Sequence, residues 1–508
     1  MLSGIILALS LGQATPARSA GCFSAPYNCF PRGDINPATP SNNAAQELAW
    51  ALFAWNDFLS LNFPAAQSGT TYLPTPSTTN GLDHGAGNYT TVWQTWPEAR
   101  DIFLPMGAAP PAFGANHVKP AACPSSPQVV GNGMVLDEYY QADHMGPVID
   151  KNGQYVRFGM NFNKPMYDYV VTNTLYTAEG QAAFDTNPNH SLDIVNWPRG
   201  AYNGGAPDTQ GSIFVKTAWK VLGAGDDPQR FFKAYAYSYT EKGGPFPFFD
   251  QPTIEADSCS VVLLGLVGMH IVHRSNSTPQ WSWATFEHVQ NGPWLHDFAD
   301  GTPAGPYSFF TPATCTSSGG APSCAYNTPP ANPWNPNVVS PTRASQLVRV
   351  GAPGPMAEIA NQAMIAQLTA AYGPTVWNNY FLVDIQFPTK VRITNPATGF
   401  AVPNPADPDG IPSPGFLPNS TVENPIQGFP EFPAAFATTN GFPVPRWDRM
   451  LNVPLLPPVN PFALSVWSIT GGASRVTSTC VGCHQDATMT SGAQAGNVYA
   501  LSRAQKTH

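Results

Sequence analysis

The sequence predicts an α+β fold that is mainly β, in which a large antiparallel sheet body carries a few helices. Proline (55) and glycine (44) are abundant among the 508 residues, and both residue types shorten or end helices. Three segments in the middle of the chain alternate with the period of two that is typical of strands, namely 213–221, 231–239 and 280–288. A sandwich is one arrangement that this pattern allows.

The composition excludes two broad classes of protein. Charged residues make up 11% of the chain, less than half of the roughly 25% usual in soluble domains, and 43% of the residues are apolar. A disordered charged tail is therefore excluded. The net charge of -9, with only 23 Lys and Arg residues, leaves no basic surface for nucleic acid.

The first twenty residues are similar to a secretory signal peptide. An apolar run over 2–11 is followed by small residues that end at Ala20, where cleavage is expected. A buried first strand or helix is the alternative, and the start codon is left open because no Lys or Arg precedes the run. The most apolar later run, 261–272, is too short to cross roughly 30 Å of hydrocarbon and is expected to be a buried strand. The mature chain is thus predicted to lack a transmembrane helix.

Six cysteines precede the C-terminal pair, and their even number in an exported chain favours disulfides. Fifteen connectivities are possible in principle. Pairing Cys22 with Cys29, and Cys315 with Cys324, would close short loops, and would leave Cys123 with Cys259 as a long-range link. Ordinary buried thiols are the alternative. Disulfides would place the protein in the periplasm or outside the cell.

Two helices have clear sequence signals. Asn43 can cap a helix over 44–61, in which apolar residues recur at helical spacing. A second helix is expected over 356–372, where Gly373 and Pro374 end it. A further strand is expected over 376–387.

The order of these features along the sequence predicts that the chain has four parts. After the signal peptide (1–20), a β-rich body with disulfides is expected over 21–390. Proline then recurs every few residues over 391–446, which predicts an extended strap or linker. The last part, 447–508, contains the strongest motif in the chain.

Residues 480–484 read Cys-Val-Gly-Cys-His. Cysteines at this spacing lie on one helical turn, where they can form thioether bonds to the two vinyl groups of a haem, and the adjacent histidine can ligate the iron. In these five residues and the export signal, the chain resembles c-type cytochromes. The resemblance implies one covalently attached haem c, held by Cys480 and Cys483, with His484 as the metal ligand.

Two other interpretations of the motif fit the sequence less well. A thioredoxin-like redox pair requires a strand just before it, where this chain has Gly-Gly-Ala-Ser at 471–474. A zinc site requires further ligands, and after the motif the sequence offers one more histidine, His508.

The sequence says less about the distal side of the haem, which is the face opposite His484. The 24 residues after His484 leave little chain to carry Met489 to the opposite face of the haem, so either the body supplies a ligand or the iron is five-coordinate. Weak distal candidates are His288, His270 and His273, each of which can equally be a hydrogen-bonded structural residue. On one strand, His270 and His273 would face opposite sides.

These patterns together favour a periplasmic or secreted monohaem c-type cytochrome that acts as a haem-dependent oxidoreductase. The size of the body is the argument for catalysis, because electron transfer alone needs far less chain. A redox partner protein or a small-molecule substrate is expected. The alternatives are a non-catalytic electron-transfer protein that docks to a redox partner, and a haem-based binding or sensor protein.

Overall fold

The computed structural model describes most of the body and parts of the C-terminal region. The described residues are 19–39, 43–129, 133–141, 146–187, 195–204, 207–243, 254–277, 281–331, 334–387, 392–395, 400–403, 417–424, 437–439, 442–444, 467–470, 473–476, 480, 484, 487–493, 495–496 and 498–507. The predicted signal peptide lies outside them except for its last two residues, and so does Cys483.

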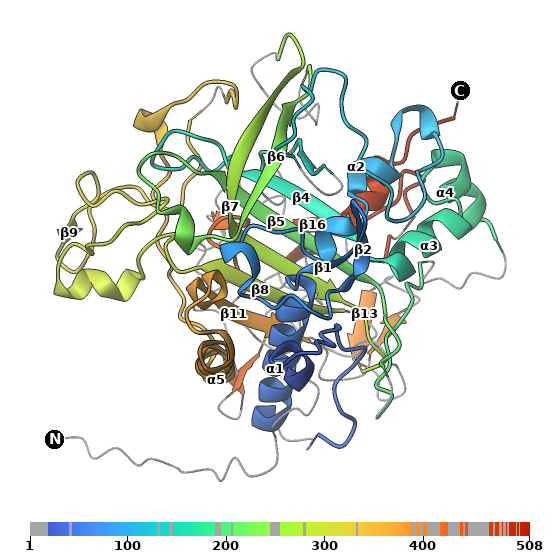
Figure 1. The fold of residues 1–508 in the computed structure, drawn as a ribbon, viewed down its shortest axis with the longest axis horizontal. Coiled ribbons are helices and arrows are strands. Elements are labelled where there is room, and N and C mark those ends of the chain that lie inside the picture. Colours follow the sequence, from blue (N-terminus) through green and yellow to red (C-terminus); the bar gives the residue numbers. More distant parts are fainter. Residues whose placement is uncertain are drawn as a thin grey trace.

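A seven-stranded sheet forms the centre of the molecule (Figure 1). Its strands are β3 (Val135–Leu136), β4 (Arg157–Phe162), β5 (Ile213–Val221), β6 (Lys233–Thr240), β7 (Ser258–His273), β8 (Ser282–His288) and β11 (Tyr380–Gln386). The main path runs β11-β8-β7-β5-β4, and every neighbour in it is antiparallel. The expectation of a large, mainly antiparallel sheet is confirmed in this part.

The sheet is mixed, however, and curls into a nearly closed barrel. Strand β6 pairs with the first half of β7, and β3 pairs with β6 in parallel. Just beyond β3, Glu138 forms an antiparallel bridge with Phe158 of β4. This bridge links β4 to the branch formed by β3 and β6, while the parallel β3–β6 pair is the part of the sheet that departs from the antiparallel expectation. A register shift between Ala218 and Trp219 of β5 adds the local twist that such curling requires.

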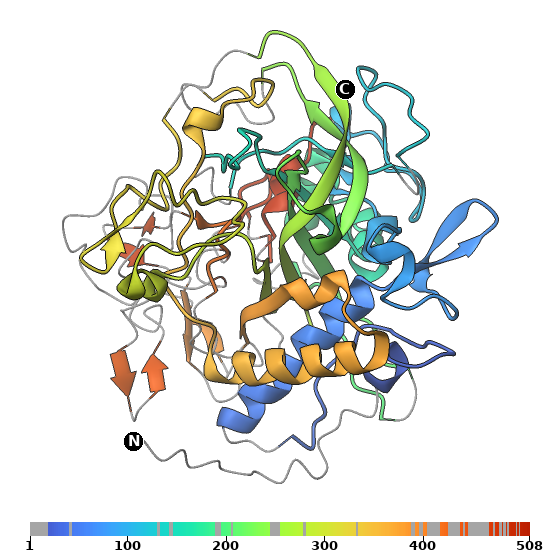
Figure 2. The same ribbon diagram turned by 60° about the vertical axis from the view of Figure 1, so that its left-hand side comes forward.

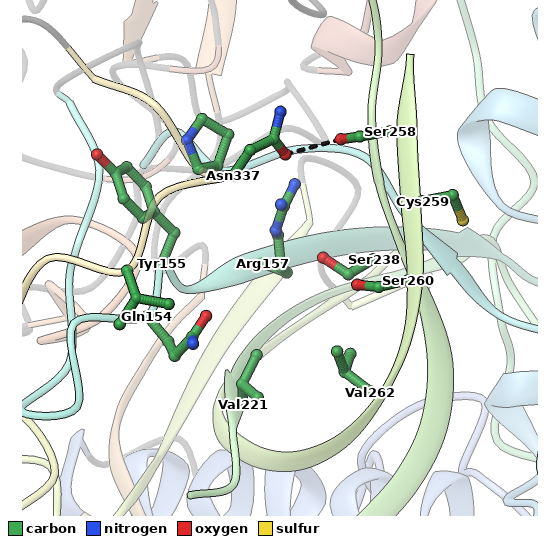
Figure 3. Close-up of a pocket in the computed structure, with 12 residues that line it drawn as sticks. Gln154, Tyr155, Arg157, Val221, Ser238, Ser258, Cys259, Ser260, Val262 and Asn337 are labelled. Carbon is green, nitrogen blue, oxygen red and sulfur yellow. Dashed lines mark hydrogen bonds between the residues drawn. The ribbon is translucent and has the colours of Figure 1, made fainter. Parts of the chain in front are cut away.

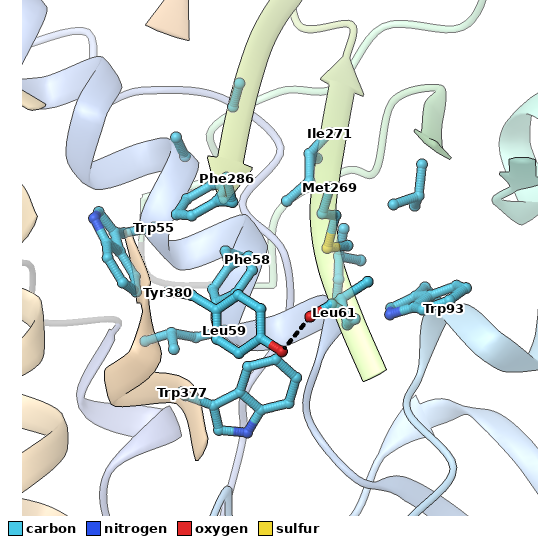
Figure 4. Close-up of a cluster of buried hydrophobic side chains, with 14 of the residues drawn as sticks. Trp55, Phe58, Leu59, Leu61, Trp93, Met269, Ile271, Phe286, Trp377 and Tyr380 are labelled. Carbon is cyan, nitrogen blue, oxygen red and sulfur yellow. Dashed lines mark hydrogen bonds between the residues drawn. The ribbon is translucent and has the colours of Figure 1, made fainter. Parts of the chain in front are cut away.

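Two helices cover one face of the sheet. They are α1 (Asn43–Leu61) and α5 (Pro355–Tyr372), close to the predicted bounds, and they lie side by side (Figure 2). In the core beneath them, the Phe58 ring stacks on Phe286 of β8 with the ring centroids 4.1 Å apart (Figure 4). Trp55 lies edge-on to the same Phe286 ring. These aromatic contacts fix α1 against the sheet.

Buried Asn361 ties the two helices to the sheet. Its side-chain oxygen accepts hydrogen bonds from the Trp55 indole (2.9 Å) and from the Leu382 backbone amide (2.8 Å). Its amide nitrogen donates to the Leu382 carbonyl oxygen at 2.9 Å. The Asn361 side chain thus supplies hydrogen-bond partners for the backbone of β11 and for the Trp55 indole of α1 in an otherwise apolar layer.

The predicted alternation in β5 is confirmed. Ile213, Val215 and Trp219 enter the core under the helices, and Phe214 packs on the opposite face. The predicted strand over 376–387 begins later than expected. Its first residues form a 3-10 turn, Val376–Asn379, because the side chains of Thr375 and Asn378 cap that turn in both directions.

Shorter elements complete the described chain. The remaining α-helices are α2 (Ala99–Ile102), α3 (Lys164–Thr172) and α4 (Ala178–Asp185). Two-stranded hairpins are β1 (Ala65–Ser68) with β2 (Thr71–Pro76), β9 (Ser317–Ser318) with β10 (Ala321–Pro322), β12 (Arg392–Asn395) with β13 (Phe400–Pro403), β14 (Ala437–Thr439) with β15 (Phe442–Val444), and β16 (Trp467–Thr470) with β17 (Ala473–Val476). The 3-10 helix η13 (Tyr499–Arg503) lies near the C-terminus.

Part of the proline-rich stretch lies on the face of the sheet opposite the helices. In the segment 417–424, Ser420 donates from its backbone amide and hydroxyl to the Glu287 carboxylate at 2.5 and 2.7 Å. Asn419 donates to the Phe286 carbonyl oxygen at 3.0 Å. This segment is therefore strapped to β8, whereas the predicted boundaries at 391–446 and 447–508 stay predictions.

All three expected disulfides are present: Cys22–Cys29, Cys123–Cys259 and Cys315–Cys324. Disulfides of this kind form and persist in oxidising compartments outside the cytoplasm. Among the described residues, no helix has both the length and the apolar character needed to span a bilayer.

We predict that the long-range disulfide contributes most to stability. Replacing Cys123 and Cys259 together by alanine should lower the free energy of unfolding by about 5 kcal/mol, because the bond closes a loop of 136 residues in the unfolded chain. The matched Cys22→Ala/Cys29→Ala variant should lose only about 2 kcal/mol, since its loop spans 7 residues. Urea titrations of both variants test this, and equal losses would contradict it.

Candidate functional site

The motif segment packs against a row of apolar side chains on the sheet. Phe162, Phe214, Val272 and Trp283 are successive cross-strand partners on β4, β5, β7 and β8. Residues from the end of the chain cover this row, among them Ala487, Met489, Val498 and Leu501. Half-buried Cys480 contacts the same cluster.

His484 lies between two aromatic rings. Its imidazole centroid is 4.4 Å from the ring of Trp283 and 5.1 Å from that of Tyr499. Cys480 and His484 are both helical, four residues apart, so the structure brings these two motif residues to one side of a helical turn. An imidazole and a thiol above an apolar, aromatic surface are donors of the type that a c-type haem requires.

His288 does not belong to this site. Its Nε2–H donates to the Arg230 carbonyl oxygen (3.0 Å), and its Nδ1 accepts from the Gln290 amide (3.1 Å). Burial, opposed by the Arg230 hydrogen bond, lowers the pKa of His288 to about 3, so the ring is neutral. Stacked on Phe231 at 4.1 Å, His288 is a structural residue.

His270 and His273 lie on opposite faces of β7, as the sequence predicted. His273 points toward α1, where its Nδ1 is 2.8 Å from the Asp57 carboxylate. His270 lies on the face that carries Trp283, because it is two residues from Val272, the cross-strand partner of Trp283. Of the three distal candidates, His270 is thus the one that shares a sheet face with the motif segment.

The ring of His270 is held on both sides. Its Nδ1 is 2.8 Å from the Thr285 hydroxyl, and its Nε2 is 2.7 Å from a carboxylate oxygen of Glu423 in the 417–424 segment. Burial alone would raise the pKa of Glu423, but the charge and hydrogen bond of His270 hold it below its usual value. The 417–424 segment and β7 are therefore joined by a hydrogen bond between His270 and Glu423.

A second cluster of chemically active side chains was not foreseen from the sequence. Glu98, Asp101 and His117 are buried, and their ligand atoms lie within 4.8 Å of one another, as in sites for divalent cations. Glu98 precedes α2 and Asp101 lies on it, where they form a capping box. That box is the signal in the sequence, whereas nothing local marks His117.

The internal contacts of this cluster use most of its ligand atoms. His117 Nδ1 is 2.5 Å from Asp101, whose other oxygen accepts from the Val118 amide at 2.8 Å. The Val135 amide donates to Glu98 at 3.1 Å. Among the described residues, His117 Nε2 and the second Glu98 oxygen have no hydrogen-bond partner. Two such atoms are fewer than the three protein ligands typical of a catalytic zinc site.

The cluster is strongly coupled electrostatically. Burial, with a smaller contribution from the charge of Asp101, raises the pKa of Glu98 to about 7 against the pull of His117. Burial alone would lower the pKa of His117, but Glu98 and Asp101 raise it to about 9. Glu98 and His117 therefore both hold a proton more tightly than the free side chains do.

Comparison of the chain with protein-family models, curated proteins and solved structures found no match in any of the three.

We predict that this cluster makes stability fall as pH rises. Both folded-state pKa values lie above the ordinary ones, 4.5 for Glu98 and 6.5 for His117, so the folded protein binds protons more tightly than the unfolded chain. The contribution of Glu98 is lost between about pH 4.5 and 7, and that of His117 between about pH 6.5 and 9.

Glu98→Gln should flatten this dependence by an amount on the order of 2 kcal/mol, because it removes one titration and weakens the other. Chemical denaturation between pH 5 and 9 measures it. His296→Gln is the control, since 72% of that side chain is exposed. If Glu98→Gln keeps the slope of the unmodified protein, the cluster does not control the pH dependence.

Proposed function

We propose that the protein is an exported monohaem c-type cytochrome that acts as a haem-dependent oxidoreductase. The observation that carries the proposal is the Cys-x-x-Cys-His motif, together with the position of its His484 ring against Trp283. Cys480 and Cys483 would hold the haem through thioether bonds, and His484 would be the iron ligand. The bound haem would supply one-electron chemistry.

The residues around the motif would orient the His484 ring and keep water away from it. Trp283 and Tyr499 restrict the orientation of the His484 imidazole from two sides. Trp283 is only 5% exposed, and the apolar row on the sheet excludes water from that side. A low-polarity environment of this kind tunes the redox potential of a haem.

The three disulfides favour a periplasmic or secreted location for this redox chemistry. Such bonds are rare in the reducing cytoplasm. The same compartment suits a protein whose cofactor is attached through cysteines. Six of the eight cysteines are paired in the three disulfides, which leaves Cys480 and Cys483 for the haem.

The contacts of the candidate distal histidines favour catalysis over simple electron transfer. Both ring nitrogens of His270 and both of His288 are occupied by hydrogen bonds within the protein, and His273 lies on the other face of β7. A histidine that is already bonded at both nitrogens would have to break a contact to ligate iron. The alternative, a six-coordinate electron-transfer protein that docks to a redox partner, requires that rearrangement.

Covalent haem is the first expected result. Produced in a host that attaches c-type haem, the protein should retain haem through denaturing electrophoresis, and Cys480→Ser/Cys483→Ser should lose it. Cys315→Ser/Cys324→Ser is the matched control, because it removes a cysteine pair that is disulfide-bonded outside the motif. An unmodified chain without covalent haem would overturn the proposal.

The second expected result concerns the distal side. Carbon monoxide should shift the absorption spectrum of the reduced protein, and His270→Gln should leave that shift unchanged, because His270 is engaged by Thr285 and Glu423. A reduced spectrum that carbon monoxide does not change would favour the electron-transfer alternative. Carbon monoxide binding that appears only in His270→Gln would identify His270 as the distal ligand.

A further inference from the structure

A cavity of about 270 Å³ opens at one end of the barrel (Figure 3). It lies where β4 begins, β5 ends, and β6 pairs with the first half of β7. The side chains around it come from β4, β5, β6 and β7 and from the loops at 154–155 and 336–339. It is separate from the row that carries Trp283, which lies at the other end of β4, beside Phe162.

The cavity exists because of the alternation in β6. Tyr237 and Tyr239 point to the outer side, where they pack around the Cys123–Cys259 disulfide. The intervening inward positions are small, and among them Ser238 is the cross-strand partner of Ser260. Alternating tyrosines and small residues thus leave space on the inner side of the barrel. Tyr237 and Tyr239 are therefore packing residues, and Ser238 between them lines the cavity.

A buried cation forms one wall. Arg157 is 4% exposed, yet among the described residues no carboxylate oxygen lies within ion-pair distance of its guanidinium. It donates to the Tyr239 carbonyl oxygen (2.9 Å) and the Thr240 hydroxyl (3.1 Å). Burial lowers the pKa of Arg157 to about 10. A buried charge without a counter-ion is costly, and an anion would remove that cost.

The arginine keeps donors for a ligand. A guanidinium has five N–H groups, and its two hydrogen bonds within the described part of the chain use two of them. Figure 3 shows the Arg157 side chain between Asn337 and Ser238, with the hydroxyls of Ser238 and Ser260 pointing toward the same space. Guanidinium and hydroxyl donors together suit the two oxygens of a carboxylate.

The opposite wall is apolar. Val221 and Val262 line the cavity and pack against the main core behind it. At the mouth, Ser258 donates to the Asn337 side chain at 2.7 Å, so the loop around 335–339 is tied across the entrance. The space is slightly below the range of about 300–1,000 Å³ that is usual for ligand pockets, which limits the ligand to a small ring or a short chain.

We propose that this cavity binds a small organic monocarboxylate. The carboxylate would be held by Arg157 with the hydroxyls of Ser238 and Ser260, and the apolar part would contact Val221 and Val262. One unpaired cation indicates one negative charge on the ligand. This site is independent of the haem proposal, because it lies at the opposite end of β4 from the row that carries Trp283, and it can be tested whether or not haem is attached.

Calorimetric titration of the full chain with benzoate and hexanoate tests the proposal, with benzamide as the uncharged analogue. We expect saturable binding of at least one carboxylate and at least tenfold weaker binding of benzamide. Arg157→Gln should weaken carboxylate binding at least tenfold. Lys164→Gln, which removes a cation that is exposed on α3, should not change it.

Two further variants cover the case in which Arg157→Gln fails to fold. Ser238→Ala/Ser260→Ala should weaken binding several-fold without a change in thermal unfolding, and Val262→Phe should abolish it by filling the apolar wall. Equal binding of benzoate and benzamide would overturn the proposal, as would unchanged affinity in all of these variants. Tighter binding of inorganic phosphate than of either carboxylate would overturn the ligand class.

Discussion

Strand β7 is the constraint on which the rest of the structure depends. Its first half pairs with β6 and its second half with β8, and β5 runs along its other edge. Because side chains alternate along a strand, its sixteen residues assign Met269 and Ile271 to the helix-covered core and His270 and Val272 to the opposite face. If β7 shifted by one residue in its pairing, these faces would be exchanged, and so would the positions of the row that carries Trp283 and of the cavity lining.

The two faces are closed by different means. Apolar packing of α1 and α5 covers one face, with aromatic side chains from α1 and aliphatic ones from α5, whereas polar contacts hold the 417–424 segment on the other. There the buried Glu287 carboxylate accepts from Ser420 and from Arg349, whose guanidinium Nε is 2.8 Å away. Removing either partner of a buried ion pair of this kind costs about 3–5 kcal/mol. The strap is therefore held by charge as much as by apolar contact, which suits a proline-rich segment that cannot extend the sheet.

The chain has few charged residues, and several of them are buried in compact networks. Lys220 lies between Asp150 and Asp226 at 3.4 and 2.7 Å, and Glu98, Asp101 and His117 compensate one another in the same way. Arg157 differs because its polar contacts are neutral. Beside these ion-paired networks, the neutral contacts of Arg157 support the cavity as a ligand site, and the apolar wall opposite it narrows the ligand class.

The sequence by itself determined the features that depend on neighbouring residues. Helical spacing predicted α1, alternation predicted β5 and its faces, loop length favoured the three disulfides, and the Cys-x-x-Cys-His motif singled out Cys480 and His484. Tertiary structure decided what depends on distant segments meeting: the Glu138–Phe158 bridge that nearly closes the barrel, the contact of His270 with Glu423, and the convergence of Glu98 with His117. Propensity and periodicity act over a few residues. The packing of the whole chain determines which helices and strands meet. No local pattern could therefore have placed Arg157 beside Ser238.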